Sequence, residues 1–116
     1  MRYKDIKDTP KDCVFCKKIQ EENLHHLGGD TVWFEPLNPV TKGHILVVPI
    51  HHVEDFSEDW AESAETMHWA SILAEKMKNV NLITSKGEYA TQSIKHFHIH
   101  LVPRRKSDNL KLPWSL

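Results

Sequence analysis

The sequence predicts an α+β fold, in which one antiparallel sheet packs against helices within a single domain. The chain has 116 residues, which is enough for one hydrophobic core and too few for two. Segments with strand character and segments with helical character are segregated along the chain instead of alternating, and this favours an antiparallel sheet. Residues 96–102 alternate between histidine and apolar side chains, which is the pattern of a strand with one buried face.

The composition argues against several classes of protein. The formal net charge is −1, which argues against a dedicated nucleic-acid-binding protein held by bulk charge. The N-terminal residues lack the apolar segment of a signal peptide, and no apolar run has the length of a membrane span. We therefore expect a cytoplasmic protein with no membrane partner, in a compartment where thiols stay reduced. Nine histidines accompany only two cysteines, so the search for a site starts with histidine.

The N-terminal part is predicted to be a flexible arm followed by a short helix. Residues 1–12 are polar and charged, as is usual for a loosely ordered end of a chain. The helix should begin after Cys13. Its apolar side would consist of Val14, Phe15 and Ile19.

Two strands are predicted next, with a turn before the first. The glycines of residues 28–30 indicate a turn, and the β-branched and aromatic residues of 31–35 indicate a strand. The run 44–49 is almost wholly apolar, which predicts a strand covered on both faces. Pro49 should end this strand.

A long helix is predicted over residues 58–79. Ser57 is the expected N-cap, and Lys76 and Lys78 near the end would suit the negative pole of the helix dipole. Its apolar residues recur at intervals of three and four, which predicts one stripe packed on the core. The stripe would consist of Trp60, Ala64, Met67, Ala74 and Met77.

The last part of the chain should hold two further strands and a tail. Strands are predicted over 80–84 and 96–102, and Pro103 should end the second. Residues 105–116 are expected to form a C-terminal tail that begins with basic, solvated residues. Trp114 in this tail could pack on a partner subunit, line the entrance of a pocket, or do neither.

Cys13 and Cys16 form a Cys-x-x-Cys pair, which in a reducing compartment is half of a metal site or a redox dithiol. Two inert thiols are a third interpretation. A redox pair is expected in a βαβ setting, whereas this pair follows an arm and precedes a short helix. Structural zinc takes four nitrogen or sulfur ligands in a tetrahedron, so two histidines would have to complete such a site.

His96, His98 and His100 should project from one face of their strand. Neighbouring imidazoles would lie ~6.6 Å apart, because a strand rises by ~3.3 Å per residue. One hypothesis is a catalytic zinc held by all three. A second is nucleophilic catalysis at phosphorus, in which a neutral imidazole attacks and its neighbours donate hydrogen bonds to phosphate oxygens. The preceding Gln92 and Ser93 offer the amide, hydroxyl and backbone groups that phosphate pockets use. Histidines on a solvated sheet face are the remaining interpretation.

Three blocks of this sequence resemble the histidine triad (HIT) family. Residues 92–104 (QSIKHFHIHLVPR) resemble its His-φ-His-φ-His-φ-φ signature with the preceding Gln-Ser, where φ is an apolar residue. Residues 41–52 (TKGHILVVPIHH) resemble its Gly-His-x-Leu-Val-x-Pro-x-x-His block. Residues 13–17 (CVFCK) resemble the Cys-x-φ-Cys segment of the zinc-containing branch. The blocks occur in the family's order and together span most of the chain.

The resemblance implies a HIT-like domain over residues 13–104, with a five-stranded antiparallel sheet and two helices, usually as a homodimer. It implies a hydrolase or transferase acting at the α-phosphorus of a nucleotide conjugate (a phosphoramidate, a dinucleotide or a nucleotidyl ester) through a covalent nucleotidyl-histidine. His98 would be the nucleophile, His100 would contact the phosphate and the leaving group, and His44 would support the same pocket. No catalytic metal is implied. The other implied roles are phosphate binding by Gln92 and Ser93, and structural zinc binding by Cys13, Cys16, His52 and His96.

The nucleoside contacts depart from the family's pattern. Pro36 occupies the position where the family usually has an acidic residue for the ribose hydroxyls, and Glu35 beside it is the expected substitute. Ser85 replaces a usual Asn, which makes it a candidate for nucleotide contact, and Thr91 replaces a usual Gly. These departures motivate an alternative function, a non-catalytic, zinc-stabilised nucleotide-binding or adaptor protein. The other histidines are expected to be surface or helix-face residues, namely His25, His26, His51 and His68.

Overall fold

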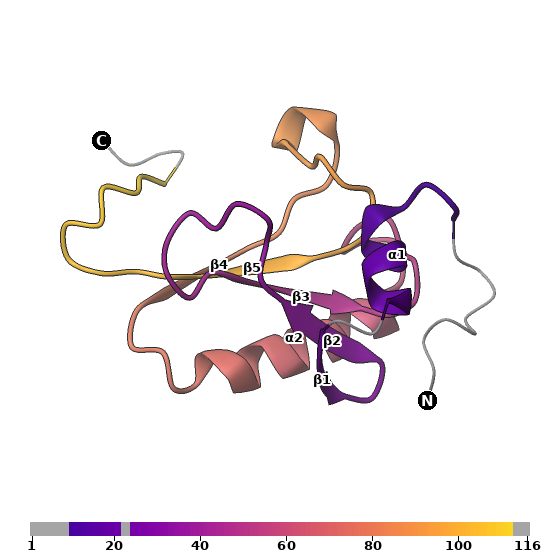
Figure 1. Cartoon of the computed structure of the whole chain (residues 1–116), viewed down its shortest axis with the longest axis horizontal. Helices are drawn as coiled ribbons and strands as arrows, with labels where there is room; N and C mark the ends of the chain where they lie inside the picture. Colours follow the sequence, from indigo (N-terminus) through magenta and orange to yellow (C-terminus); the bar gives the residue numbers. More distant parts are fainter. Residues whose placement is uncertain (1–9, 22–23, 113–116) are drawn as a thin grey trace.

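A five-stranded antiparallel sheet forms the middle of the molecule, with helix α1 on one face and helix α2 on the other (Figure 1). The computed structural model describes residues 10–21 and 24–112. This architecture confirms the predicted α+β class. The elements in chain order are α1 (Val14–Gln20), β1 (His25–Gly28), β2 (Thr31–Phe34), β3 (Ile45–Pro49), α2 (Trp60–Ala74), β4 (Val80–Ile83), the 3-10 turn η2 (Glu88–Ala90) and β5 (Ile99–Pro103).

The sheet has the strand order β1-β2-β3-β5-β4, so the last strand of the chain inserts between β3 and β4. β3 is therefore central, and all five of its residues are buried, as predicted for the apolar run. The registers of neighbouring strands align Phe34, Leu46, His100 and Ile83 in one row that crosses four strands. His100 thus lies within the sheet surface and not at its rim.

Each face of the sheet has its own apolar cluster. Leu46 belongs to the cluster under α1, while its neighbour Ile45 belongs to the cluster under α2, as alternation along a strand requires. Phe97, Ile99 and Leu101 also lie in the α2-side cluster. The histidines that alternate with them consequently lie on the opposite side, which confirms the predicted division of residues 96–102.

The histidine strand is shorter than predicted. β5 begins at Ile99, so His96 and His98 lie in the extended segment that precedes it. Phe97 N–H donates to the carbonyl of Val53 at 2.7 Å, which fixes this segment against a loop instead of a neighbouring strand. Side-chain alternation therefore continues beyond the end of the hydrogen-bonded ladder.

Strand β1 was not predicted from the sequence. Its first two residues are exposed and its last two are half-buried, so it lacks the alternation that identifies strands. It pairs with β2 through the predicted turn. A Cβ built on Gly28 would lie 2.3 Å from Cζ2 of Trp69, so this glycine lets the hairpin pack closely on α2.

Helix α2 begins later than predicted, because Asp59 is its N-cap and Ser57 is not. The Asp59 carboxylate accepts hydrogen bonds from the backbone N–H groups of Ala61 and Glu62. The Ser57 side chain donates instead to the carboxylate of Asp55 at 2.6 Å. The acid two residues downstream thus outcompetes the expected serine.

The predicted end of α2 is wrong, and the predicted apolar stripe is correct only at Ala74 and Met77, which pack against the core. Trp60 is 86% exposed and Met67 is 45% exposed, whereas Thr66 and Ala70 are fully buried. Apolar residues occur on both sides of this helix, so their spacing alone did not identify the buried side. The helix ends at Ala74, and the two lysines expected in its last turn lie beyond it. In α1, likewise, the predicted apolar residue Val14 is 53% exposed.

Some predictions concern residues outside the described ranges. Residues 1–9 of the predicted arm and Trp114 in the tail are among them. In the part of the tail that is described, Arg105 donates to Thr41 Oγ1 and to the carbonyl of Lys42, both at 2.9 Å. No helix within the described ranges is long and apolar enough to cross a membrane.

Candidate functional site

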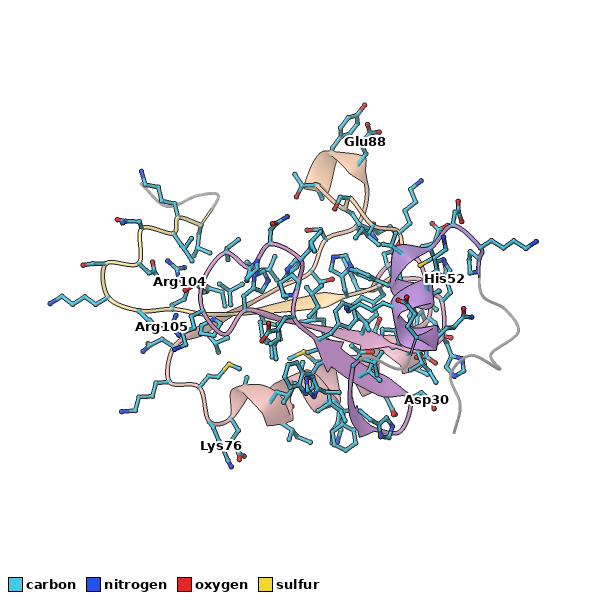
Figure 2. The ribbon with its side chains drawn as sticks, in the orientation of Figure 1. Asp30, His52, Lys76, Glu88, Arg104 and Arg105 are labelled. Atoms are coloured by element: carbon cyan, nitrogen blue, oxygen red, sulfur yellow. The ribbon has the colours of Figure 1, made fainter. Side chains whose placement is uncertain are left out.

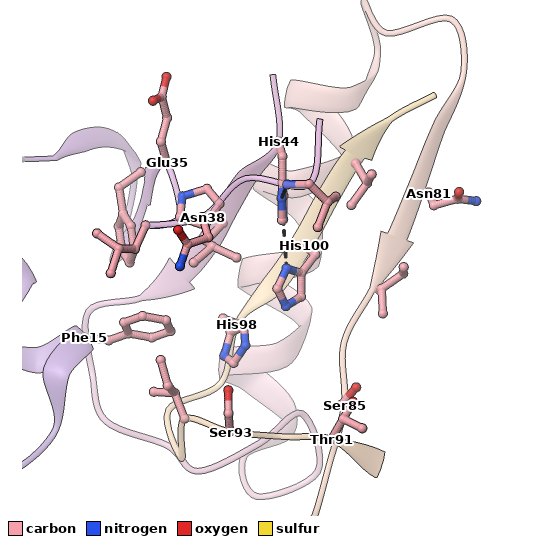
Figure 3. A pocket seen from close by; sticks show the side chains of 18 of the residues that line it. Phe15, Glu35, Asn38, His44, Asn81, Ser85, Thr91, Ser93, His98 and His100 are labelled. Carbon is pink, nitrogen blue, oxygen red and sulfur yellow. Dashed lines mark hydrogen bonds between the residues drawn. The ribbon is translucent and has the colours of Figure 1, made fainter. Parts of the chain in front are cut away.

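A cavity of about 1410 Å³ lies over the α1-side face of the sheet. Its floor comes from the ends of β2, β3, β4 and β5, and its walls come from α1, the loop 35–40, the segment 91–94 and the C-terminal segment 110–112. His44, His98 and His100 all line it, as Figure 3 shows. The cavity is large enough for a ligand of nucleotide size.

His98 has a defined tautomer. Its Nδ1 lies 2.7 Å from the backbone carbonyl of His96, and a carbonyl can only accept, so Nδ1 carries the proton. The lone pair is then on Nε2, the nitrogen that remains for chemistry. A neutral imidazole with its lone pair on an otherwise uncommitted nitrogen is a competent nucleophile.

His44 and His100 form a second ordered pair. The backbone N–H of Val40 donates to Nδ1 of His44 at 3.1 Å, so the proton of His44 is on Nε2. This Nε2–H donates to Nδ1 of His100 at 3.0 Å (Figure 3). His100 therefore carries its proton on Nε2, where it can donate to a ligand in the cavity. The two rings that line the cavity side by side are thus an acceptor, His98, and a donor, His100.

Burial keeps these three imidazoles neutral. Desolvation lowers the pKa of His98 and the pKa of His44 from their ordinary values. Desolvation, assisted by the neighbouring His98 and His44, lowers the pKa of His100 to about 4. At neutral pH the cavity consequently presents uncharged imidazoles, the form that attacks or donates without first losing a proton.

Cys13, Cys16, His52 and His96 form a separate cluster whose four ligand atoms lie within 4.8 Å of one another. The sulfur of Cys16 lies 3.4 Å from Nδ1 of His52 and 3.4 Å from Nδ1 of His96, and the sulfur of Cys13 lies 3.5 Å from His96 Nδ1. Around a tetrahedral zinc with bonds of ~2.3 Å to sulfur and ~2.0 Å to nitrogen, sulfur and nitrogen would be ~3.5 Å apart. The donor set and its spacing fit such an ion.

The local structure prepares this cluster. His96 is fully buried, and its Nε2 donates to the carbonyl of Pro49 at 2.8 Å, which leaves the lone pair on Nδ1 toward the sulfurs. Cys13 is the N-cap of α1, and its sulfur accepts the N–H of Cys16. The side-chain hydrogen bond from Cys16 lowers the pKa of the Cys13 thiol, and the thiolate is the form that binds metals. Among the described residues, His98 and His100 do not belong to the metal-competent group, which disfavours a zinc held by three histidines.

The residues predicted to bind phosphate or nucleoside differ in their surroundings. Ser93 and Ser85 line the cavity, and Ser93 lies beneath His98 in Figure 3. Gln92 also lines it, but its carboxamide accepts from the N–H of Gly87 at 2.9 Å and donates to the carbonyl of Ile94 at 3.1 Å. It also donates to the carbonyl of Glu54, so this side chain stabilises its own loop and joins it to the segment before α2.

Glu35 lies at the rim of the cavity. It is exposed, and in Figure 3 its carboxylate points away from the histidines. Asn38, from the same loop, lies nearer to them in that view, and the sequence analysis did not single it out. An asparagine in a loop next to proline is the usual signature of a turn, so the sequence offered no signal for this position.

Arg104 also has a structural role that was not predicted from the sequence, where it stands only as the last residue of a motif. Its guanidinium donates to both carboxylate oxygens of Asp108, at 2.8 and 3.0 Å, to Oδ1 of Asn81 at 2.7 Å and to the carbonyl of Leu110 at 2.6 Å. These bonds hold the segment 110–112 against the cavity. Arg104 and Arg105 lie at the opposite end of the molecule from His52 (Figure 2). The spacing of four between Arg104 and Asp108 was the one available signal.

The fold and the site together define a class of protein. It is a small α+β protein with an imidazole-lined cavity and a neighbouring cluster of two cysteines and two histidines. The chain belongs to the HIT domain family, whose model matches residues 18–107. The matched range contains the three cavity histidines and begins after Cys13 and Cys16.

Similar proteins support this assignment. The chain is 32% identical over 120 residues to the protein named hit of Bacillus subtilis, covering 90% of this chain and 79% of that protein. It is 28% identical over 99 residues to an adenosine 5'-monophosphoramidase of Saccharomyces cerevisiae, covering 80% of this chain and 63% of the yeast protein. A solved structure from Streptococcus mutans is 28% identical, with a TM-score of 0.84 over 96% of this chain and 77% of that chain.

Proposed function

We propose that this protein is a hydrolase or transferase that acts at the α-phosphorus of a nucleotide conjugate through a covalent intermediate on His98. The single observation that carries the proposal is the hydrogen bond from His98 Nδ1 to the carbonyl of His96, which leaves a lone pair on Nε2. The lowered pKa of this imidazole, caused by burial, favours the neutral nucleophile.

In the first step, His98 Nε2 forms a bond to the α-phosphorus while the bond from phosphorus to the leaving group breaks. The Nε2–H of His100 donates a hydrogen bond to the phosphate or to the leaving atom, and the leaving group takes a proton from solvent as it departs. In the second step, water attacks phosphorus, the bond to His98 breaks, and the imidazole returns to its neutral form. One water molecule is consumed, its hydroxyl going to phosphorus and its proton replacing the one that left.

The substrate class follows from the cavity and from the relatives. The yeast relative is named as an adenosine 5'-monophosphoramidase, and this supports a phosphoramidate as the first substrate to test. A dinucleotide or a nucleotidyl ester would react at the same phosphorus. Ser93, Ser85 and Gln92 are proposed to face the phosphate, and Glu35 is proposed to reach the ribose after a movement of its loop.

We propose zinc as the ion held by Cys13, Cys16, His52 and His96. The donor set of two thiols and two imidazoles, with its tetrahedral spacing, supports zinc. When bound, the ion would supply structural stabilisation. The steps at phosphorus need no catalytic metal. The two free thiols are also consistent with the predicted cytoplasmic location, which stays a prediction.

A homodimer is also proposed. β4 pairs only with β5 among the described residues, so its other edge is open. Leu82 on β4 is 39% exposed, which offers apolar area at that edge. An identical strand from a second copy would satisfy both the open edge and the apolar area.

The covalent step is tested with adenosine 5'-phosphoramidate and intact-mass measurement. We expect a nucleotidyl adduct on the wild-type chain under rapid quenching, and a loss of turnover of roughly 10³-fold or more in His98→Ala, because the nucleophile is absent. His68→Ala is the matched control, since this histidine is exposed on α2 and lies outside the cavity. Robust turnover by wild type with no adduct on His98 would exclude the covalent scheme.

A second function remains open, a nucleotide-binding protein with little turnover. The exposed Glu35, with Pro36 beside it, favours this alternative because its carboxylate, the expected ribose contact, points away from the cavity histidines. It predicts that AMP binds in calorimetry while wild type and His98→Ala hydrolyse the phosphoramidate equally slowly. A large difference in rate between the two proteins would eliminate it.

The zinc site is tested by metal analysis of purified variants. We expect one zinc per chain in the wild type and in His98→Ala, and substantially less in Cys13→Ser and Cys16→Ser, because each substitution removes a sulfur ligand. Full zinc content in both cysteine variants, with loss in His98→Ala, would instead favour an ion held by the histidine row.

A further inference from the structure

The candidate metal site and the cavity share one wall, and this wall is Phe15. The residue lies between Cys13 and Cys16 in the sequence, on the first turn of α1. It is itself buried, at 7% exposure, and it lines the cavity. The backbone on both sides of Phe15 would therefore be held by the ion, while its ring faces the nucleotide pocket.

The Phe15 ring contacts His98 in an edge-to-face arrangement. The ring centroids are 5.1 Å apart and the planes are 88° apart, and Figure 3 shows Phe15 beside His98. The same ring packs against Phe34 at 5.3 Å and against His96 at 5.9 Å, also edge to face. Such contacts depend on orientation, because the positive edge of one ring meets the negative face of the other. A rotation of α1 would disturb all three contacts together.

A second link joins the same two sites through the backbone. The carbonyl of His96 accepts from Nδ1 of His98 at 2.7 Å, and the imidazole of His96 is one of the four proposed ligands. Ligation of His96 would therefore fix the peptide group that orients His98. His98 is thus held by the ring of Phe15 and by the backbone carbonyl of His96. His96 is a proposed ligand, and Phe15 lies between two others.

We propose that Phe15 is a positioning residue for His98, and that through it the occupancy of the metal site and the binding of a nucleotide are linked. The inference rests on the proposed function, because it requires a nucleotide in the cavity. With metal bound, Phe15 and His98 are in place before the nucleotide arrives, so binding has less ordering to do. By reciprocity, a bound nucleotide must raise the affinity for the metal by the same factor.

The first test measures this factor in both directions. The affinity for AMP is measured by calorimetry on zinc-loaded and zinc-stripped protein, and the affinity for zinc is measured by chelator competition with and without saturating AMP. We expect AMP to bind roughly 5- to 20-fold more tightly to the loaded protein, and zinc affinity to rise by the same factor. Equal AMP affinity of the two forms would overturn the proposal.

Variants separate Phe15 from the rest of α1. Phe15→Leu keeps apolar volume but removes the aromatic edge, and it should bring the ratio of loaded to stripped affinities close to one while one zinc per chain is retained. The readout is this ratio and not the affinity, because Phe15 also lines the cavity. Lys17→Ala is the control, since Lys17 is exposed next to Cys16 and lies outside the cavity, and it should keep the wild-type ratio. An unchanged ratio in Phe15→Leu would overturn the role of this residue.

A spectroscopic measurement covers the case in which the stripped protein unfolds. The protein is loaded with Co²⁺ in place of zinc, and its ligand-field absorption is recorded as AMP is added. We expect a change in the spectrum of the wild type and of Lys17→Ala, and none in Phe15→Leu at AMP concentrations that saturate it. A wild-type spectrum that does not respond to bound AMP overturns the linkage. Absence of AMP binding to any form would instead count against the proposed function, so the two failures are distinguishable.

Discussion

Backbone groups determine which ring nitrogen carries the proton in His44, His96 and His98, whereas the side chain of His44 determines it in His100. The carbonyl of Pro49 does so for His96, and the N–H of Val40 does so for His44. These partners are main-chain atoms, so substitution of a single side chain leaves them in place. The sequence identified the histidines but could not predict their tautomers, because these depend on the local path of the backbone and, for His96, on a carbonyl 47 residues away.

The depressed pKa values in the cavity predict activity in mildly acidic solution. An imidazole of ordinary pKa ~6.5 would be mostly protonated at pH 5.5, whereas burial lowers the pKa of His98 and lowers that of His100 to about 4. We expect kcat/KM for adenosine 5'-phosphoramidate, corrected for uncatalysed hydrolysis, to fall in acid with a midpoint below pH 6.5, because burial lowers the pKa of His98. A fall centred near pH 6.5 would contradict this account.

The lowered pKa of His100 also predicts that the free energy of unfolding decreases in acid. The unfolded chain binds a proton on this imidazole at pH ~6.5, but the folded chain binds it only near pH 4, so the free energy of unfolding falls as the pH falls through this window. The expected contribution of His100 is on the order of 2 kcal/mol, since the imidazole is only partly buried. Urea unfolding of zinc-loaded protein at pH 7 and pH 5 measures it. His100→Gln should lose less stability between these two pH values, and His68→Ala should behave as the wild type.

At the scale of the elements, the sequence predicted the buried strand well and the long helix poorly. The residues of β3 are apolar at every position, so both faces of this strand were expected to be buried. Helix α2 has apolar residues on both sides, and its exposed Trp60 was predicted to be buried. Helix α2 packs mainly on β3 and β5, and these contacts determine which of its sides faces inward. Such contacts join segments distant in the chain, and no local pattern contains them.

The loop between η2 and β5 contains a residue with a strained backbone, and a substitution can remove this strain. Thr91 has φ 66° and ψ 29°, a left-handed conformation that is unfavourable for a β-branched residue by ~1–2 kcal/mol. Glycine adopts it freely but gives the unfolded chain more entropy, so we expect Thr91→Gly to raise the free energy of unfolding by roughly 0.5–1 kcal/mol in urea titrations. Ala90→Gly, within η2, is the matched control and should be destabilising. A destabilised Thr91→Gly protein would show that the threonine side chain stabilises the loop more than its backbone strain costs.

At the scale of the whole molecule, the open edge of the sheet predicts the oligomeric state. Light scattering on a sizing column should give twice the 13.5 kDa mass of one chain. Leu82→Glu adds a charge beside the open edge of β4 and should shift the protein toward monomer. Lys76→Glu, which also adds negative charge but lies away from that edge, should leave the dimer intact. A wild-type mass of one chain at micromolar concentration would exclude the dimer.

The sequence predicted which residues form the site, but it predicted less of how they are arranged. The histidine row and the Cys-x-x-Cys pair are local patterns, so both could be identified from the sequence. In the structure, the row contributes to the cavity and the pair belongs to the metal cluster. The family resemblance, and not the local pattern, predicted that His96 would lie with the cysteines while His98 and His100 would line the cavity. The hydrogen bond of Gln92 to the carbonyl of Glu54 and that of Arg104 to the carbonyl of Leu110 were not predicted, because each depends on the backbone of another segment.

The spacing of the proposed metal ligands also bears on how the chain acquires its ion during synthesis. Two of the sulfur–imidazole contacts join residues 36 and 83 positions apart, and His96 is the last ligand to be made. A nascent chain that has emerged only as far as β3 can offer two thiols but not a four-ligand site. The ion can therefore be captured fully only after most of the sheet has left the ribosome. Loading of the metal would then report that the segment before β5 has reached the two cysteines.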